Sequence, residues 1–216
     1  MAKNHAPAWG ENMKIFNIVF SLLFSIIIFT IACGNADKEE PETSGTKMAM
    51  TDTMKLTSPD FNEGEMISPQ FTCDSTDVSP LLVIENPPED TKSFALICDD
   101  PDAPHGTWVH WVVFNIPADM RELPERFGNS GLIKKAIDSS NVSIVQGKND
   151  FGHTGYGGPC PPPGRDHRYF FRLYALDVYI EFVDVLISRG ITRTELDEAM
   201  EGHILAETTL MGKYKR

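Results

Sequence analysis

Basic residues are scarce in this sequence. Its 216 residues include 19 Lys and Arg against 31 Asp and Glu, which gives a formal net charge of −12. Proteins that bind nucleic acid need clustered Lys and Arg to neutralise the phosphates. The acidic balance therefore argues against nucleic acid as a partner, although it leaves room for a local cationic pocket.

The sequence also lacks the short motifs of common hydrolases. It contains neither an H-E-x-x-H zinc motif nor a G-x-S-x-G nucleophile elbow, and it has no internal repeat. Its four cysteines do not have the spacing of a zinc site. These absences favour a binding protein over an enzyme, and we expect neither a bound metal nor a cofactor.

One long apolar run is present, close to the N-terminus. Residues 15–32 read IFNIVFSLLFSIIIFTIA, with no charge inside the run and Lys14 directly before it. About 18 apolar residues can form a short membrane span or the core of a signal peptide. Ala32, Cys33 and the polar stretch that follows resemble the end of a bacterial lipoprotein signal.

This resemblance implies that residues 1–32 are a signal peptide, for which Met13 could be the true start, and that Cys33 carries lipid after cleavage. Residues 33–55, rich in Lys, Glu, Thr, Ser and Met, would then be a flexible tether. An uncleaved membrane anchor is the open alternative. In both cases we expect a membrane-anchored protein of the cell envelope that faces the periplasm or the exterior.

The remaining residues, 56–216, have the size of one domain. Short apolar runs broken by Pro, Gly, Asn and Asp are typical of a β-rich fold. Three runs rich in β-branched or aromatic residues are predicted to be buried strands: Ser93–Cys98, Trp108–Ile116 and Arg168–Leu176. The stretch GLIKKA (131–136) fits either a strand or a short helix.

Alternation along a strand predicts which side chains share a face. His110 is expected on the face that carries Trp108, Val112 and Phe114. His167, at the start of the third strand, is expected on the face that carries Tyr169, Phe171 and Leu173.

A helix is predicted close to the C-terminus. Thr192 and Glu195 have the spacing of a capping box. The apolar positions that follow predict one buried helix face, made of Leu196, Ala199, Met200, His203 and Ile204. A second helical segment is expected in DVLISRG, ending at Gly190.

The domain contains Cys73, Cys98 and Cys160. An oxidising compartment permits one disulfide among these three cysteines, but the sequence does not indicate which pair forms it. Three reduced, buried thiols are the alternative.

Two stretches combine backbone breakers with titratable and aromatic residues. The first, DDPDAPHGTWVHW, spans Asp99–Trp111, and its prolines turn the chain directly after a predicted strand. The second, GYGGPCPPPGRDHRYFF, spans Gly155–Phe171. Its glycines would let the backbone approach a ligand, and its prolines would stiffen the wall. The coincidence of the two stretches predicts a rigid cavity lined by Asp100, His110 and His167.

These two stretches resemble the signature blocks of the phosphatidylethanolamine-binding protein family, in its bacterial, Raf-kinase-inhibitor-like branch. The resemblance extends over most of residues 56–216, and also includes SPQFTCDSTDVSPLL and ELDEAMEGHILAETTLMGKY. It implies a mainly β fold with a large central sheet, a smaller second sheet and a C-terminal helix. It also implies a small pocket for phosphate or phosphorylated headgroups. One departure is Ile84, at a position where bacterial members usually have tryptophan.

By motif position, the resemblance assigns eight residues to the pocket: Asp100, Asp102, Trp108, His110, Gly158, Pro159, His167 and Tyr169. Imidazole titrates near neutrality, and a carboxylate beside it favours the protonated ring. A protonated His110 or His167 could therefore donate to phosphate oxygens, and Trp108 could hold an ammonium group against its face. The sequence thus predicts a binding protein for a small anionic ligand such as phosphoethanolamine.

The sequence is also compatible with three other functions. Two Asp and two His could form a metal site in a hydrolase. Cys160 could act as a nucleophile beside His167. The family name also suggests an inhibitor or regulator of a protease or kinase that acts through protein contact, with an unknown partner.

Overall fold

The computed structural model describes residues 53–129, 133–137 and 142–216. The predicted signal peptide, Cys33 and most of the predicted tether lie outside these residues. No helix within the described ranges is long and apolar enough to cross a membrane.

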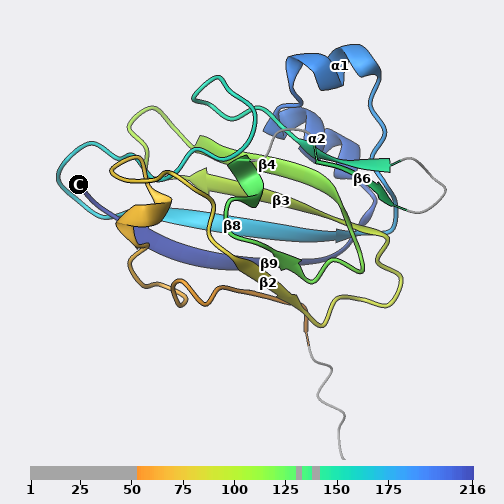
Figure 1. The fold of residues 1–216 in the computed structure, drawn as a ribbon, viewed down its shortest axis with the longest axis horizontal. Coiled ribbons are helices and arrows are strands. Elements are labelled where there is room, and N and C mark those ends of the chain that lie inside the picture. Colours follow the sequence, from red (N-terminus) through yellow and green to blue (C-terminus); the bar gives the residue numbers. More distant parts are fainter. Residues whose placement is uncertain (1–52, 130–132, 138–141) are drawn as a thin grey trace, which may run out of the picture. The chain divides into compact units, whose positions relative to one another are not determined.

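Two antiparallel sheets form the domain (Figure 1). The smaller sheet has the order β1-β2-β5, with strands Lys55–Thr57, Leu82–Glu85 and Glu122–Leu123. The larger sheet has the order β6-β7-β4-β3-β8-β9. Its strands are β6 Ile133–Ile137, β7 Val142–Gln146, β4 Trp108–Pro117, β3 Ser93–Asp100, β8 His167–Leu176 and β9 Ile204–Tyr214.

The three strands predicted from the sequence are confirmed as β3, β4 and β8, the centre of the larger sheet. Every residue of β3 is buried, because β3 is covered on both faces as well as paired on both edges. The stretch that fitted either a strand or a helix overlaps β6, which covers residues 133–136 of it.

Each face of the larger sheet is covered by a separate apolar core. On one face, residues of the small sheet such as Leu82, Ile84 and Leu123 pack against Phe94 and Leu96 of β3. On the other face, the helices α1 (Asp184–Arg189) and α2 (Arg193–Met200) cover the sheet through residues that include Leu186, Leu196 and Met200. The element order is completed by two short 3-10 turns, η1 (Pro69–Phe71) and η2 (Phe127–Asn129).

The predicted C-terminal helix is shorter than the apolar pattern suggested. The capping box of Thr192 and Glu195 is confirmed, and α1 ends at Arg189 with Gly190 as its C-cap, as expected. However, α2 ends at Met200, so His203 and Ile204 do not belong to its buried face. The chain turns at Gly202, where φ is 80°, and then enters β9.

The pairing of β9 with β8 explains this difference. The register runs from Ile204 opposite Leu176 to Tyr214 opposite His167, so β9 pairs along the full length of β8. A ladder of this length is a non-local interaction, and it outweighs the local preference for a longer helix.

One disulfide joins Cys73 to Cys160, and Cys98 is a buried free thiol in β3. The structure therefore selects one of the pairs that the sequence left open. It also removes the interpretation of Cys160 as a nucleophile, because its sulfur is in a disulfide and not a thiolate.

Candidate functional site

A cavity of about 190 Å³ lies where three strands of the larger sheet meet. Asp100 is the last residue of β3, Trp108 and His110 lie at the start of β4, and His167 is the first residue of β8. Antiparallel pairing brings these strand ends to the same edge of the sheet. All four side chains line the cavity, so the structure brings together the three residues from which the sequence predicted it.

A β-bulge changes the course of β4 at the cavity. Cys98 pairs with Trp111, but the next residue of β3, Asp99, pairs with Val109. His110 is therefore an extra residue in β4 with no partner in β3. A bulge of this kind re-aims a side chain and increases the local twist.

The bulge decides which face carries His110. Trp111 lies in the core under the small sheet, and the His110 ring contacts Tyr169 of the same core, with 5.2 Å between ring centroids. Val112 and Phe114 pack in the other core, under the helices. The prediction that His110 shares a face with Val112 and Phe114 is therefore wrong, because simple alternation fails at the bulge.

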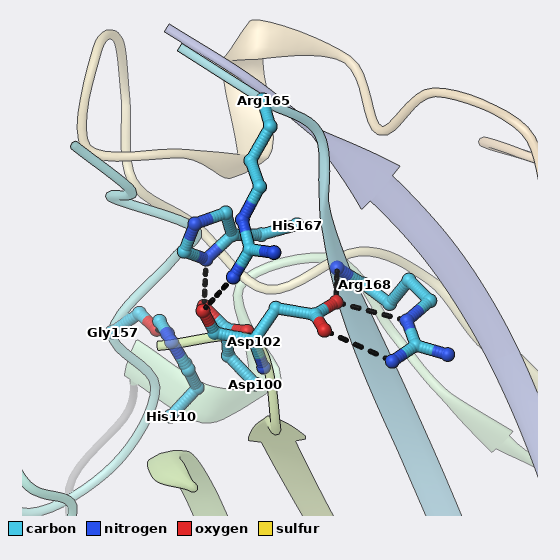
Figure 2. Close-up of polar contacts among 7 residues, drawn as sticks. All are labelled: Asp100, Asp102, His110, Gly157, Arg165, His167 and Arg168. Atoms are coloured by element: carbon cyan, nitrogen blue, oxygen red, sulfur yellow. Dashed lines mark hydrogen bonds and ion pairs between the residues drawn. The ribbon is translucent and has the colours of Figure 1, made fainter. Parts of the chain in front are cut away.

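Asp100 and His167 form a buried pair at the cavity (Figure 2). The Nδ1 atom of His167 lies 2.7 Å from Oδ2 of Asp100, and both side chains are less than 5 % exposed. The other carboxylate oxygen, Oδ1, accepts a hydrogen bond of 2.8 Å from the backbone N–H of Asp102. The pair fixes the orientation of the imidazole ring and leaves Nε2 as the ring nitrogen for a ligand.

His110 is held by a backbone carbonyl. Its Nδ1–H donates to the oxygen of Gly157 over 2.7 Å, and its ring lies edge-on to Phe151 and Tyr169. Burial lowers the pKa of His110 below its ordinary value, against the opposing effects of this hydrogen bond and of Asp100. The neutral ring therefore dominates near pH 7, and its Nε2 is an acceptor, not the cationic donor that the sequence suggested.

Two buried donors beside the cavity, Trp108 Nε1–H and the Tyr169 hydroxyl, have no hydrogen-bond partner in the described part of the chain. Burial, followed by the charge of Asp100, raises the pKa of Tyr169 well above its usual range, so the hydroxyl keeps its proton. Buried donors without partners are uncommon in native proteins, and they often mark a site for a ligand or an ordered water.

Four of the residues assigned by resemblance lie outside the cavity lining. Tyr169 lies behind His110, in the core. Asp102 forms a bidentate ion pair with Arg168, with distances of 2.8 and 2.9 Å, and these hydrogen bonds lower its pKa to about 2 (Figure 2). The backbone N–H of Gly158 donates to Asp77, and the carbonyl of Pro159 accepts from Cys73.

The glycines of the second stretch make room for the protein itself. A Cβ atom at Gly158 would lie 2.4 Å from the carbonyl oxygen of Phe71, and one at Gly155 would lie 2.3 Å from that of Gly128. At Gly157 it would lie 2.6 Å from the ring of Phe151. These glycines were predicted to let the backbone approach a ligand. In the structure they instead let other segments of the protein pack closely against this backbone.

The structure adds residues to the cavity that had not been assigned to it. Cys160, Pro161 and Pro162 form one wall, in agreement with the stiffening that their prolines suggested. His105, which lies within the first of the two stretches but was not assigned to the pocket, also lines the cavity, as does Phe151, which nothing in the local sequence distinguishes. Phe151 is brought there by long-range contacts, with 5.5 Å between its ring centroid and that of Trp108.

Two further observations concern the chemistry of the site. Among the residues that the structure describes, no group of three or more His, Cys, Asp or Glu side chains is arranged to hold a metal ion. Ile84, the position that departs from the family pattern, is buried between the sheets and does not line the cavity.

Comparison with known proteins identifies the family. A family model described as phosphatidylethanolamine-binding protein matches residues 57–215. The chain belongs to this family. Among curated members, a UPF0098 protein of Methanothermobacter thermautotrophicus is 47 % identical over 163 residues, which cover 76 % of this chain and 99 % of the relative. A UPF0098 protein of Aquifex aeolicus is 46 % identical and covers 76 % of this chain and 89 % of its own length.

Solved structures of the phosphatidylethanolamine-binding protein family have the same fold. A homologue from Chlamydia trachomatis gives a TM-score of 0.63 at 37 % identity, covering 76 % of this chain and 98 % of the homologue. YbcL of Escherichia coli, described as a member of the mammalian family, gives 0.65 at 32 % identity with the same coverage. The strand-rich architecture with two sheets that the sequence predicted is therefore confirmed.

Proposed function

We propose that the cavity binds the phosphate group of a small ligand, either free phosphate or a phosphorylated headgroup such as phosphoethanolamine. The observation that carries this proposal is the buried Asp100–His167 pair, which holds an imidazole at the cavity wall with Nδ1 engaged and Nε2 available. A ring that carries both protons donates from Nε2 to a phosphate oxygen, and such charge-assisted bonds are about twice as strong as neutral ones.

The surroundings of the pair favour an acceptor-rich ligand. Both oxygens of Asp100 already accept hydrogen bonds, one from His167 and one from the backbone N–H of Asp102. The carboxylate is therefore engaged within the protein and not directed at the ligand. Trp108, which lines the cavity, adds an indole N–H that has no hydrogen-bond partner among the described residues. The volume of about 190 Å³ suits a headgroup better than a large molecule.

A headgroup that carries an amine gains a further contact. The ring of Trp108 lies at the cavity with Phe151 edge-on to it, and an ammonium group over an indole face is stabilised by about 0.5–2 kcal/mol. This contact should make phosphoethanolamine bind more tightly than inorganic phosphate, which can contact only the histidine side of the cavity.

Calorimetric titration of the full chain with inorganic phosphate and with O-phosphoethanolamine tests the proposal. Wild type should bind both, the amine-bearing ligand more tightly, and His167→Ala should abolish both. His203→Ala is the matched control, because His203 forms a similar pair with Asp177, at 2.9 Å, on the exposed surface. Wild-type heats indistinguishable from buffer, or full binding by His167→Ala, would overturn the proposal. Vesicles that contain phosphatidylethanolamine distinguish a lipid headgroup from the free compound.

We also propose that the domain is tethered outside the cytoplasm through lipid on Cys33. The support is the apolar run that ends at Ala32 and the disulfide between Cys73 and Cys160, since disulfides persist in oxidising compartments. Labelled palmitate should enter the wild-type protein and the Cys98→Ala variant but not Cys33→Ala. Equal labelling of Cys33→Ala would contradict the tether.

A further inference from the structure

The Gly157–Gly158 peptide is bonded on both of its sides. Its carbonyl oxygen, that of Gly157, accepts from Nδ1 of His110 at 2.7 Å. Its N–H, that of Gly158, donates to Oδ1 of Asp77, also at 2.7 Å. One peptide plane therefore connects a carboxylate outside the cavity with a histidine that lines it.

The orientation of this peptide determines which proton His110 carries. A carbonyl oxygen can only accept, so Nδ1 of the neutral ring must bear the hydrogen and Nε2 must be the acceptor. If the peptide turned over, an N–H would face Nδ1 and the opposite tautomer would be required. Glycine on both sides gives the backbone unusual freedom to turn, so the chosen orientation needs a partner to hold it.

We infer that Asp77 is a positioning residue for the cavity: it holds the Gly157–Gly158 peptide so that His110 presents Nε2 as a hydrogen-bond acceptor. Asp77 is itself held in place. Its backbone has φ of 55°, a conformation that Asp and Asn tolerate better than most residues, and its carbonyl accepts from Asn129 Nδ2 at 3.0 Å.

Neighbouring contacts keep the segment 71–77 against the cavity wall. The hydroxyl of Tyr156 donates to the carbonyl of Phe71 at 2.8 Å. The backbone N–H of Cys73 donates to Pro159, and the disulfide to Cys160 follows directly. The close approach at Gly158 leaves no space for a side chain between Asp77 and the peptide. Asp77 is thus held rigidly, and it fixes the tautomer of His110 through the single Gly157–Gly158 peptide.

The inference rests on the proposed function and specifies the ligand further. An acceptor at His110 requires a ligand that brings a hydrogen to that side of the cavity, as the P–OH of a singly protonated phosphate or the N–H of an ammonium does. A fully deprotonated phosphate would meet the lone pair of Nε2 and be disfavoured. The cavity would therefore hold such a ligand between the acceptor Nε2 of His110 and the imidazole of His167, both of which line it.

The tautomer of His110 is measurable without any ligand. In the full chain with ¹⁵N-labelled histidine, ring-nitrogen shifts report which nitrogen is protonated, and the His110→Gln spectrum assigns the signals among the six histidines. Wild type should show a protonated Nδ1. Asp77→Gly accommodates the positive φ but removes the carboxylate. In this variant His110 should show a mixture of the two neutral tautomers. Asp77→Asn keeps an acceptor oxygen and should restore it.

Phosphate titration of the same variants links the tautomer to binding. We expect the dissociation constant for inorganic phosphate to rise about tenfold in Asp77→Gly, the usual scale for a residue that acts through a ligand-contacting group, and to return close to wild type in Asp77→Asn. An unchanged Nδ1–H tautomer in a folded Asp77→Gly protein would overturn the inference. If the His110 tautomer depends on Asp77 but the wild-type protein does not bind phosphate, the inference is supported and the proposed function is overturned.

Discussion

Asp100 and His167 are 67 residues apart in the chain, yet their side chains meet at 2.7 Å in a buried ion pair or hydrogen bond. The antiparallel pairing of β3 with β8 brings them together, because the C-terminal end of β3 lies close to the N-terminal end of β8. The sheet therefore provides the rigid base of the site, and the loops on either side provide its walls.

The pH dependence of stability should show the neutral state of His110. Burial lowers the pKa of His110 in the folded state, so the unfolded chain binds this proton more readily. Its contribution to stability is complete above the unfolded pKa of about 6.5 and is lost as the pH falls below that value. Urea denaturation of wild type should give a lower free energy of unfolding at pH 5 than at pH 7. In His110→Gln the decrease should be smaller, and an equal decrease would contradict a neutral His110.

The disulfide should contribute strongly to stability. It closes a loop across a sequence separation of 87, and the loss of such a bond typically costs about 2–5 kcal/mol. We expect a loss of this size in the free energy of unfolding when Cys73 and Cys160 are both replaced by Ser, and a similar loss in reduced wild type. Cys98→Ala is the control, since it removes the free thiol and leaves the bond. A double variant as stable as wild type would show that the bond adds nothing.

Gly158 should not tolerate a side chain. A Cβ atom there would lie within 3 Å of the Phe71 carbonyl, the Asp77 carboxylate and the Thr72 backbone, and backbone cannot simply move aside. We expect Gly158→Ala to lower the free energy of unfolding by about 1–3 kcal/mol, as overpacking does. Gly106→Ala is the comparison: its φ is 106°, but the space around it is open, so its cost is only that of the backbone conformation. Equal costs at the two positions would contradict the close packing.

Phe151 should affect binding more than stability. Its side chain is 42 % exposed, but its ring lies edge-on to both Trp108 and His110 at the cavity. We expect Phe151→Ala to lower the free energy of unfolding by about 1 kcal/mol, the scale of aromatic pairs, while weakening the binding of O-phosphoethanolamine severalfold in calorimetry. Val185→Ala, at another exposed apolar side chain, should change neither quantity. Unaltered binding in Phe151→Ala would exclude the ring from the site.

Local pattern was sufficient for much of this protein. Runs of apolar and β-branched residues predicted β3, β4 and β8, because strand formation in a buried sheet follows side-chain type over a few residues. The capping box at Thr192 was predicted correctly for the same reason, since both of its partners lie within one turn. His167 shares the face of Tyr169 and Phe171 because β8 alternates without interruption there.

Contacts between distant segments decided the rest. The bulge at His110 depends on how β3 pairs with β4, β9 replaced a longer helix because β8 offered a full-length partner, and the choice of Cys73 for Cys160 required two remote loops to meet. The link from Asp77 to His110 is of the same kind. A chain of residue types specifies which groups can interact, but distance and orientation arise only when the sheet brings separate segments into contact.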